Sequence, residues 1–207
     1  MSMIKKGVYI VINPAEDRDK IIKQILKIKN ENIAAIQIWD NPKLKVIDSD
    51  LLRFIVSTFK NKVPVLINNK WKLLKDYNLD GIHFDKLPNN LDEIEKELEK
   101  GFIKGITLGN DLSLIPKIKN HAFDYLSFCS MFPSSTVSNC TIVSKEIVKR
   151  CSELIDIPIF LSGGISLENV SKLNELNIHG IALVTGIMHA TDPKAVLYKY
   201  ISKLNLK

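Results

Sequence analysis

Two glycine-containing segments near the carboxyl end of the chain have the composition of an anion-binding site. Gly163 and Gly164 stand in one segment, and Thr185 and Gly186 stand in the other. Adjacent glycines let backbone N–H groups approach an anion, and a short helix after Thr185 and Gly186 would point its N-terminus at the same space. We therefore predict phosphate binding at these four residues. A glycine-rich turn before a helix capped by Ser166 is the alternative.

Polar side chains also stand within or after three earlier apolar segments. Gln37 lies in the first of these segments, Asn68 directly follows the second, and His83 lies in the third. All three are candidate catalytic residues, although a histidine inside an apolar segment is more often a packing residue. Asp85 follows shortly after His83, and its carboxylate could hold Mg²⁺ or could instead cap a turn.

A cluster of hydroxyl side chains follows a further apolar segment. Ser134, Ser135 and Thr136 are consecutive, and their hydroxyl groups could donate to a second phosphate or to a diphosphate. Such clusters are also common in ordinary polar loops. We keep Ser134 and Thr136 as predicted phosphate-binding residues.

The elements that must position these side chains alternate between short apolar runs and segments of helical period. The apolar runs, which are rich in β-branched residues, are 7–12, 34–38, 63–67, 81–84, 105–108, 125–128, 157–161 and 180–184. The segments of helical period are 18–30, 49–60, 70–76, 91–100, 112–120, 144–153, 167–176 and a last one after Pro193.

Strands that alternate with helices predict a parallel sheet with crossover helices. Eight such units predict a compact (β/α)₈ TIM barrel with about 26 residues per unit, whereas six would favour an open doubly wound sheet. We expect residues 1–207 to form a single domain. In a barrel of this kind the active site lies at the carboxyl ends of the strands, where all the candidate side chains stand. Pro116 predicts that the fifth helix begins late.

Composition excludes several classes of protein. The chain is 45% hydrophobic and 25% charged, which is ordinary for a soluble globular protein, and no apolar run approaches the roughly 18 residues of a membrane span. Three cysteines without metal-ligand spacing predict neither a disulfide framework nor a zinc site, so we expect a cytoplasmic protein. The net charge of +6 comes from dispersed lysines, so we expect no nucleic-acid partner, and we leave a homo-oligomer open.

The sequence resembles the thiamine phosphate synthase / TenI superfamily over nearly its whole length. The most specific pieces are Phe-Pro-Ser-Ser-Thr at 132–136, Ser-Gly-Gly-Ile-Ser-Leu-Glu-Asn at 162–169 and Thr-Gly-Ile-Met at 185–188. Further matching pieces are 9–14, 36–38, 66–69, 80–84 and 124–128.

The resemblance implies an activity and a set of ligands. Synthases of this superfamily join a hydroxymethylpyrimidine diphosphate to a thiazole phosphate in thiamine biosynthesis, with Mg²⁺ stabilising the leaving diphosphate. By this resemblance Gln37 and Asn68 lie near the pyrimidine or its diphosphate, and Ser134 and Thr136 bind diphosphate. Gly163 and Gly164 then bind the thiazole phosphate, so phosphorylated heterocycles are the expected partners.

The sequence departs from the synthase pattern at charged positions. Trp39 and Asn41 stand where synthases carry Arg and Lys, Asn69 stands where they carry Asp, and Val137 stands where they carry Lys. Asp85 opens the segment in which synthases carry Gly-Gln-x-Asp. These departures leave open whether the chain is an active synthase.

Two readings without synthase activity also stay open. One is a TenI-like isomerase of a phosphorylated thiazole, although Ser130 stands where the tautomerases carry a histidine. The other is a non-catalytic protein that binds a phosphorylated ligand.

Overall fold

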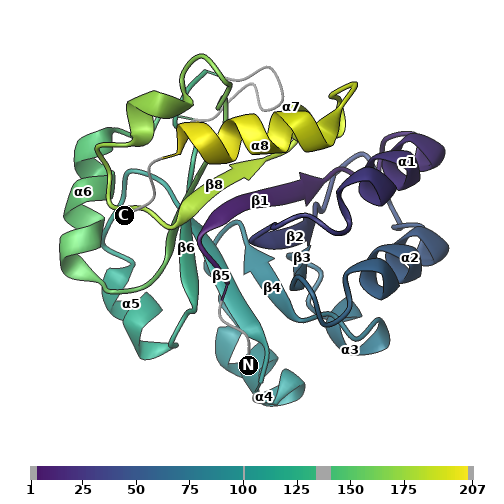
Figure 1. Ribbon diagram of the computed structural model, residues 1–207. Helices are drawn as coiled ribbons and strands as arrows, with labels where there is room; N and C mark the ends of the chain where they lie inside the picture. Colours follow the sequence, from purple (N-terminus) through teal and green to yellow (C-terminus); the bar gives the residue numbers. More distant parts are fainter. Residues whose placement is uncertain (1–3, 100, 134–140, 205–207) are drawn as a thin grey trace.

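The computed structural model describes residues 4–99, 101–133 and 141–204. Eight parallel strands follow one another in chain order and close into a barrel (Figure 1), which confirms the predicted (β/α)₈ fold and excludes the open sheet. The strands are β1 (Gly7–Ile12), β2 (Ala35–Ile38), β3 (Val65–Asn68), β4 (Gly81–Phe84), β5 (Ile103–Leu108), β6 (Tyr125–Cys129), β7 (Ile159–Ser162) and β8 (Gly180–Leu183).

Helices surround the barrel and run between successive strands. The α-helices are α1 (Arg18–Ile28), α2 (Ser49–Phe59), α3 (Leu73–Asp76), α4 (Leu91–Leu98), α5 (Ile115–Asn120), α6 (Lys145–Leu154), α7 (Thr185–Met188) and α8 (Pro193–Lys203). The predicted late start of the fifth helix is confirmed, because α5 begins at Ile115 with Pro116 in its first turn. None of the helices in the described residues is long and apolar enough to cross a membrane.

The predicted helix 167–176 is wrong, because the structure has only the 3₁₀ helix η1 (Val170–Leu173) there. The side chain of Asn169 accepts from the Ser166 N–H and donates to the Gly164 carbonyl, both at 2.8 Å. Ser166 in turn accepts from the Glu168 N–H at 3.3 Å. These bonds close a local turn, which competes with an α-helix for the same backbone groups.

Large aromatic side chains fill the barrel interior because glycines on neighbouring strands leave room for them. Gly105 pairs in register with Tyr125, and a Cβ atom at Gly105 would lie 2.0 Å from Cζ of Tyr125. Gly180 similarly faces Phe160. Tyr9, Tyr125 and Phe160 pack together with ring centroids 5.7–6.0 Å apart and form the floor beneath the carboxyl ends of the strands.

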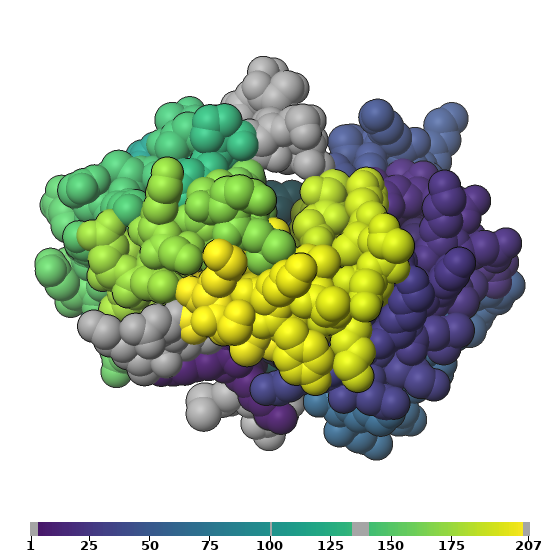
Figure 2. Space-filling model, turned by 45° about the horizontal axis from the view of Figure 1, so that its top comes forward, coloured from purple at the N-terminus to yellow at the C-terminus, as the bar shows by residue number. Residues whose placement is uncertain are grey.

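The carboxyl ends of the strands open at the top of Figure 1. Figure 2 turns this end forward and shows a small recess between the yellow C-terminal segment and the green segment before it. Active sites of (β/α)₈ barrels lie at this end, which we call the mouth of the barrel.

Candidate functional site

Three predicted residues point into the upper barrel from consecutive strands. Gln37 of β2, Asn68 of β3 and His83 of β4 are 7%, 1% and 4% exposed. Asn68 and His83 are partners in the β3–β4 register, so their side chains lie on the same level of the barrel. The sequence prediction that these residues share one end of the sheet fits this placement.

Asp85, which directly follows β4, is held by two asparagine side chains at the end of β3. Asn68 donates to one carboxylate oxygen at 3.0 Å, and Asn69 donates to the other at 2.8 Å. Asn69 also accepts from the Asp85 N–H at 3.0 Å and adopts a left-handed backbone with a φ of 53°. Asparagine tolerates this conformation better than most residues. We call these three residues the carboxylate clamp; sequence reasoning did not identify Asn69 as a partner of Asp85.

Neighbouring charges leave the Asp85 carboxylate available for a cation. Lys70 pairs with Asp40 at 2.9 Å, and no ion pair of the described residues includes Asp85. Asn41, at a position where synthases carry a cation, donates to Asn13 at 2.9 Å. The mouth near β2–β4 therefore presents one carboxylate whose oxygens accept only from neutral amides.

A buried chain of hydrogen bonds lies directly beneath this clamp. The Tyr9 hydroxyl lies 2.5 Å from Gln37 Oε1 and 2.9 Å from the Tyr125 hydroxyl. The Tyr125 hydroxyl lies 2.7 Å from His83 Nδ1, and His83 Nε2 lies 2.8 Å from the Thr107 hydroxyl. Sequence reasoning missed Tyr9 and Tyr125, because an aromatic residue in an apolar run is indistinguishable from an ordinary core residue.

Burial keeps the members of this chain uncharged. It raises the pKa of Tyr9 and of Tyr125 well above the ordinary tyrosine value. It also lowers the pKa of His83 to about 4, against the opposing attraction of the Asp85 carboxylate. At neutral pH His83 therefore carries a single N–H, and both of its ring nitrogens are used inside the barrel.

Protonation of His83 is expected to destabilise the fold as the pH falls. The imidazole has a pKa of about 4 when folded and about 6.5 when unfolded, so the unfolded chain binds the proton first. The contribution of neutral His83 to the free energy of unfolding is complete above the unfolded pKa and is lost as the pH falls toward the folded pKa. The loss amounts to about 2 kcal/mol from pH 7 to pH 5. Urea unfolding with a chelator present measures the free energy of unfolding at each pH. The part of its decrease between pH 7 and pH 5 that His83 causes should be absent in His83→Gln. An equal pH dependence in both proteins would contradict the assignment.

The rim of the mouth at β7 has glycines with left-handed backbones. Gly163 and Gly164 have φ values of 82° and 66°. A Cβ atom at Gly163 would lie 2.2 Å from Ser130 Oγ, and one at Gly164 would lie 2.4 Å from the carbonyl oxygens of Phe132 and Pro133. The glycine pair therefore lets the segment after β6 pack closely against it. This packing is a structural reason for the two glycines, in addition to the predicted anion binding.

The rim at β8 differs in detail from the sequence prediction. The short helix begins at Thr185 instead of after Gly186, so both residues lie in its first turn. Gly186 packs under Tyr200, whose hydroxyl would lie 2.9 Å from an added Cβ atom. Ser134 and Thr136, the other predicted phosphate-binding residues, lie outside the described residues.

Ser130 does not offer a general base at the place where tautomerases carry a histidine. Its side chain is 2% exposed, and its hydroxyl lies 3.6 Å from Cys129 Sγ. Within the described residues its hydroxyl bonds no basic side chain, so it is not equipped for proton transfer to a ligand.

Two other features of the described residues lie away from the mouth. Asp92, Glu95 and His121 bring together side chains that could hold a metal ion, but Lys104 already pairs with Glu95 at 2.6 Å. These residues belong to α4, β5 and the end of α5, on the outside of the barrel.

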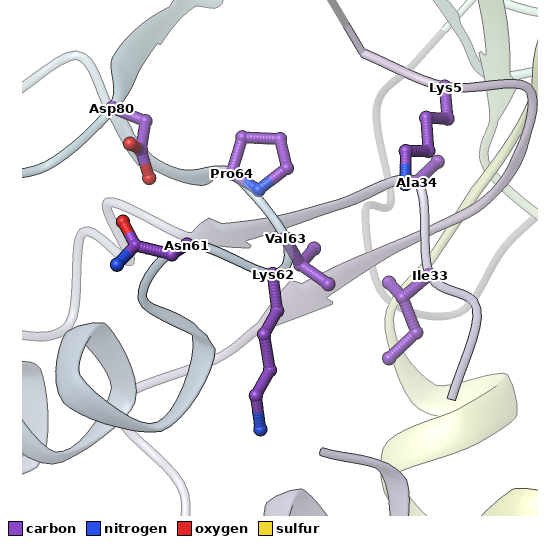
Figure 3. A pocket seen from close by; sticks show the side chains of 8 residues that line it. All are labelled: Lys5, Ile33, Ala34, Asn61, Lys62, Val63, Pro64 and Asp80. Carbon is purple, nitrogen blue, oxygen red and sulfur yellow. The ribbon is translucent and has the colours of Figure 1, made fainter. Parts of the chain in front are cut away.

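The second feature is a pocket of about 370 Å³ at the amino ends of β1–β4. It is shown in Figure 3, where the side chain of Lys62 extends away from Asp80 and Asn61. This end of a (β/α)₈ barrel usually serves stability and not chemistry.

The closed parallel barrel, with polar side chains on β2–β4 and glycines after β7 and β8, defines a protein of the (β/α)₈ class whose candidate site residues gather at the carboxyl ends of the strands. A family model described as "Thiamine monophosphate synthase" matches residues 8–187. The chain belongs to this family.

Curated relatives and solved structures agree with this membership. Thiamine-phosphate synthase of Methanobrevibacter smithii is 25% identical over 209 residues, which cover 100% of this chain and 99% of the relative. Thiamine-phosphate synthase of Picrophilus torridus is 32% identical over 146 residues, covering 70% of this chain and 71% of the relative. A structure of thiamine phosphate pyrophosphorylase from Pyrococcus furiosus superposes with a TM-score of 0.74 at 18% identity and 97% coverage of both chains, which supports the fold.

Proposed function

We propose that the protein is an active thiamine-phosphate synthase that joins hydroxymethylpyrimidine diphosphate to thiazole phosphate. In this reaction a C–N bond forms between the thiazole nitrogen and the pyrimidine methylene carbon, and the C–O bond to the diphosphate breaks. The observation that carries the proposal is the carboxylate clamp, in which Asn68 and Asn69 fix Asp85 at the mouth. It provides a carboxylate although Asn69 replaces the aspartate that synthases carry.

The residues of the clamp fit Mg²⁺. Mg²⁺ is a hard cation that is usually held by one or two carboxylates together with substrate phosphates. Asp85 presents such a carboxylate, and in the described part of the chain its side-chain partners are the neutral amides of Asn68 and Asn69. When bound there, Mg²⁺ would neutralise charge that develops on the departing diphosphate. Asn68 and Asn69 keep the Asp85 carboxylate in place, so little ordering is needed when the ligand binds.

The remaining predicted residues divide between the two ligands. Gln37 and His83 belong to the buried chain beneath the clamp, inside the barrel, and we place the pyrimidine above them. Gly163, Gly164, Thr185 and Gly186 lie on the β7–β8 rim, where backbone N–H groups would bind the thiazole phosphate. We assign Ser134 and Thr136 to the diphosphate on the strength of the sequence pattern. With phosphorylated metabolites as substrates, we place the reaction in the cytoplasm.

Binding of a phosphorylated ligand without turnover is the second function considered, because the synthase cations at Trp39, Asn41 and Val137 are missing. An isomerase is less well supported, since Ser130 is buried and, within the described residues, its hydroxyl bonds no basic side chain.

Formation of thiamine phosphate by the purified protein tests the proposal. The protein is incubated with both substrates and Mg²⁺, and the product is measured by mass spectrometry beside an established synthase. We expect product with Mg²⁺ and none with a chelator. No product, under conditions in which the established synthase works, would refute synthase activity. Calorimetric binding of thiazole phosphate in that case would establish the binding function.

A further inference from the structure

The buried hydrogen bonds beneath the mouth form one continuous chain across the barrel. It begins at Gln37 on β2, passes through Tyr9, Tyr125 and His83, and ends at Thr107 on β5. Each hydroxyl carries one proton, and a neutral imidazole also carries one N–H. The direction of any one bond therefore fixes the direction of all the others.

The bond at Gln37 sets this direction. The structure places the carboxamide oxygen Oε1 of Gln37, and not its amide nitrogen, against the Tyr9 hydroxyl. A carboxamide oxygen only accepts, so the Tyr9 hydroxyl donates to it. The Tyr9 oxygen must then accept from the Tyr125 hydroxyl.

The same counting fixes the protonation of the histidine. The Tyr125 oxygen has given its proton toward Tyr9, so it must accept from His83 Nδ1–H. His83 Nε2 then has no hydrogen and accepts from the Thr107 hydroxyl. If Gln37 were turned so that its nitrogen faced Tyr9, every bond would reverse and His83 would carry its proton on Nε2.

This arrangement leaves the amide nitrogen of Gln37 for a ligand. No hydrogen bond of the described residues uses this nitrogen, and Gln37 retains 7% exposure at the mouth. We propose that Tyr9 and Tyr125 are positioning residues that hold Gln37 with its N–H groups toward the ligand, so that the ligand must present a hydrogen-bond acceptor there. The identity of the ligand as the pyrimidine rests on the proposed function, whereas the direction of the chain does not.

The tautomer of His83 reports the orientation of Gln37 at the other end of the chain. Long-range ¹H–¹⁵N spectra of the labelled protein at neutral pH distinguish the two tautomers, and His83→Gln assigns the signal. We expect the proton on Nδ1 in the wild-type protein. Tyr9→Phe removes the acceptor for Tyr125 and so removes the directing bond, and we expect a mixture of tautomers in this variant.

Tyr198→Phe is the matched control, because Tyr198 is exposed and bonds Glu31 outside the barrel. It should leave the His83 signal unchanged. A proton on Nε2 in the wild-type protein would overturn the proposal, and so would a tautomer that Tyr9→Phe does not alter.

Ligand binding tests the second half of the proposal. Gln37→Glu keeps an oxygen for Tyr9 but replaces the N–H groups by an acceptor, and Tyr9→Phe releases the amide. We expect both variants to bind hydroxymethylpyrimidine diphosphate about tenfold more weakly, which corresponds to the loss of one hydrogen bond. We also expect KM to rise more than kcat falls. Unchanged affinity in Gln37→Glu would overturn the predicted acceptor. Absence of binding to the wild-type protein would refute the proposed function. The tautomer measurement would still determine the direction of the hydrogen bonds between Gln37 and Thr107.

Discussion

Asp85→Asn is expected to lower kcat/KM for the Mg²⁺-dependent condensation by on the order of 100-fold, the scale of removing one charged group that stabilises a transition state. The substitution keeps the shape of the side chain and removes its charge. Because Asp85 is exposed, we expect the free energy of unfolding to change by less than about 1 kcal/mol. Steady-state kinetics with varied Mg²⁺ and urea unfolding measure the two effects.

The carboxylate clamp allows a reciprocal exchange as a sharper test. In Asn69→Asp combined with Asp85→Asn, the hydrogen bond between residues 69 and 85 is retained with its donor and acceptor exchanged. Residue 69 can still accept from the N–H of residue 85, and Asn68 still finds an oxygen acceptor. The double variant should therefore recover much of the lost activity, since it returns one carboxylate to the same place.

Asp111→Asn is a suitable control, because Asp111 is an exposed acid that accepts hydrogen bonds locally from the Ser113 N–H and the Ser113 side chain. Its kinetics should match the wild-type protein. If Asp85→Asn retained full activity, or if the exchange failed to restore any while the protein remained folded, Asp85 would not be the group that acts on the diphosphate.

Gly105→Ala should destabilise the fold by about 3 kcal/mol, at the upper end of the cost of overpacking a core. The added methyl group would lie 2.0 Å from Tyr125 Cζ and 2.4 Å from its hydroxyl. Tyr125 is fully buried, so its ring has no free space into which to move. Thermal and urea unfolding measure the loss.

Gly109→Ala is the matched control at the end of the same strand, because nothing lies within 4 Å of a Cβ atom there. It should change the free energy of unfolding by less than about 0.5 kcal/mol. Comparable losses in the two variants would mean that backbone freedom, and not contact with Tyr125, accounts for the glycine at 105.

Most of the fold could be predicted from the sequence because local patterns determine it. The runs 7–12 and 81–84 coincide with β1 and β4, and the remaining strands differ by only a few residues at their ends. The helix predicted at 167–176 failed for a reason that composition does not reveal. Its apolar spacing is helical, but the Asn169 side chain bonds two backbone groups of the preceding turn.

The candidate site was predictable only as a set of positions. Parallel strands place Gln37, Asn68 and His83 at one end of the barrel, but pairing of Asn69 with Asp85 depends on strand register and on side-chain direction. The sequence likewise cannot show that Gly164 faces the carbonyl groups of residues 132 and 133. A substitution at Gly164 would therefore disturb packing as well as any bound anion.

The aromatic floor of the barrel has a kinetic consequence. Tyr9, Tyr125 and Phe160 are at most 1% exposed and close the interior between the mouth and the pocket at the opposite end. In the described part of the chain, the proposed substrates therefore reach Gln37 from the carboxyl end of the barrel and not through its interior. In the proposed synthase reaction, a joined product would occupy both the space over Gln37 and the β7–β8 rim until it departs, so we expect product release to govern turnover.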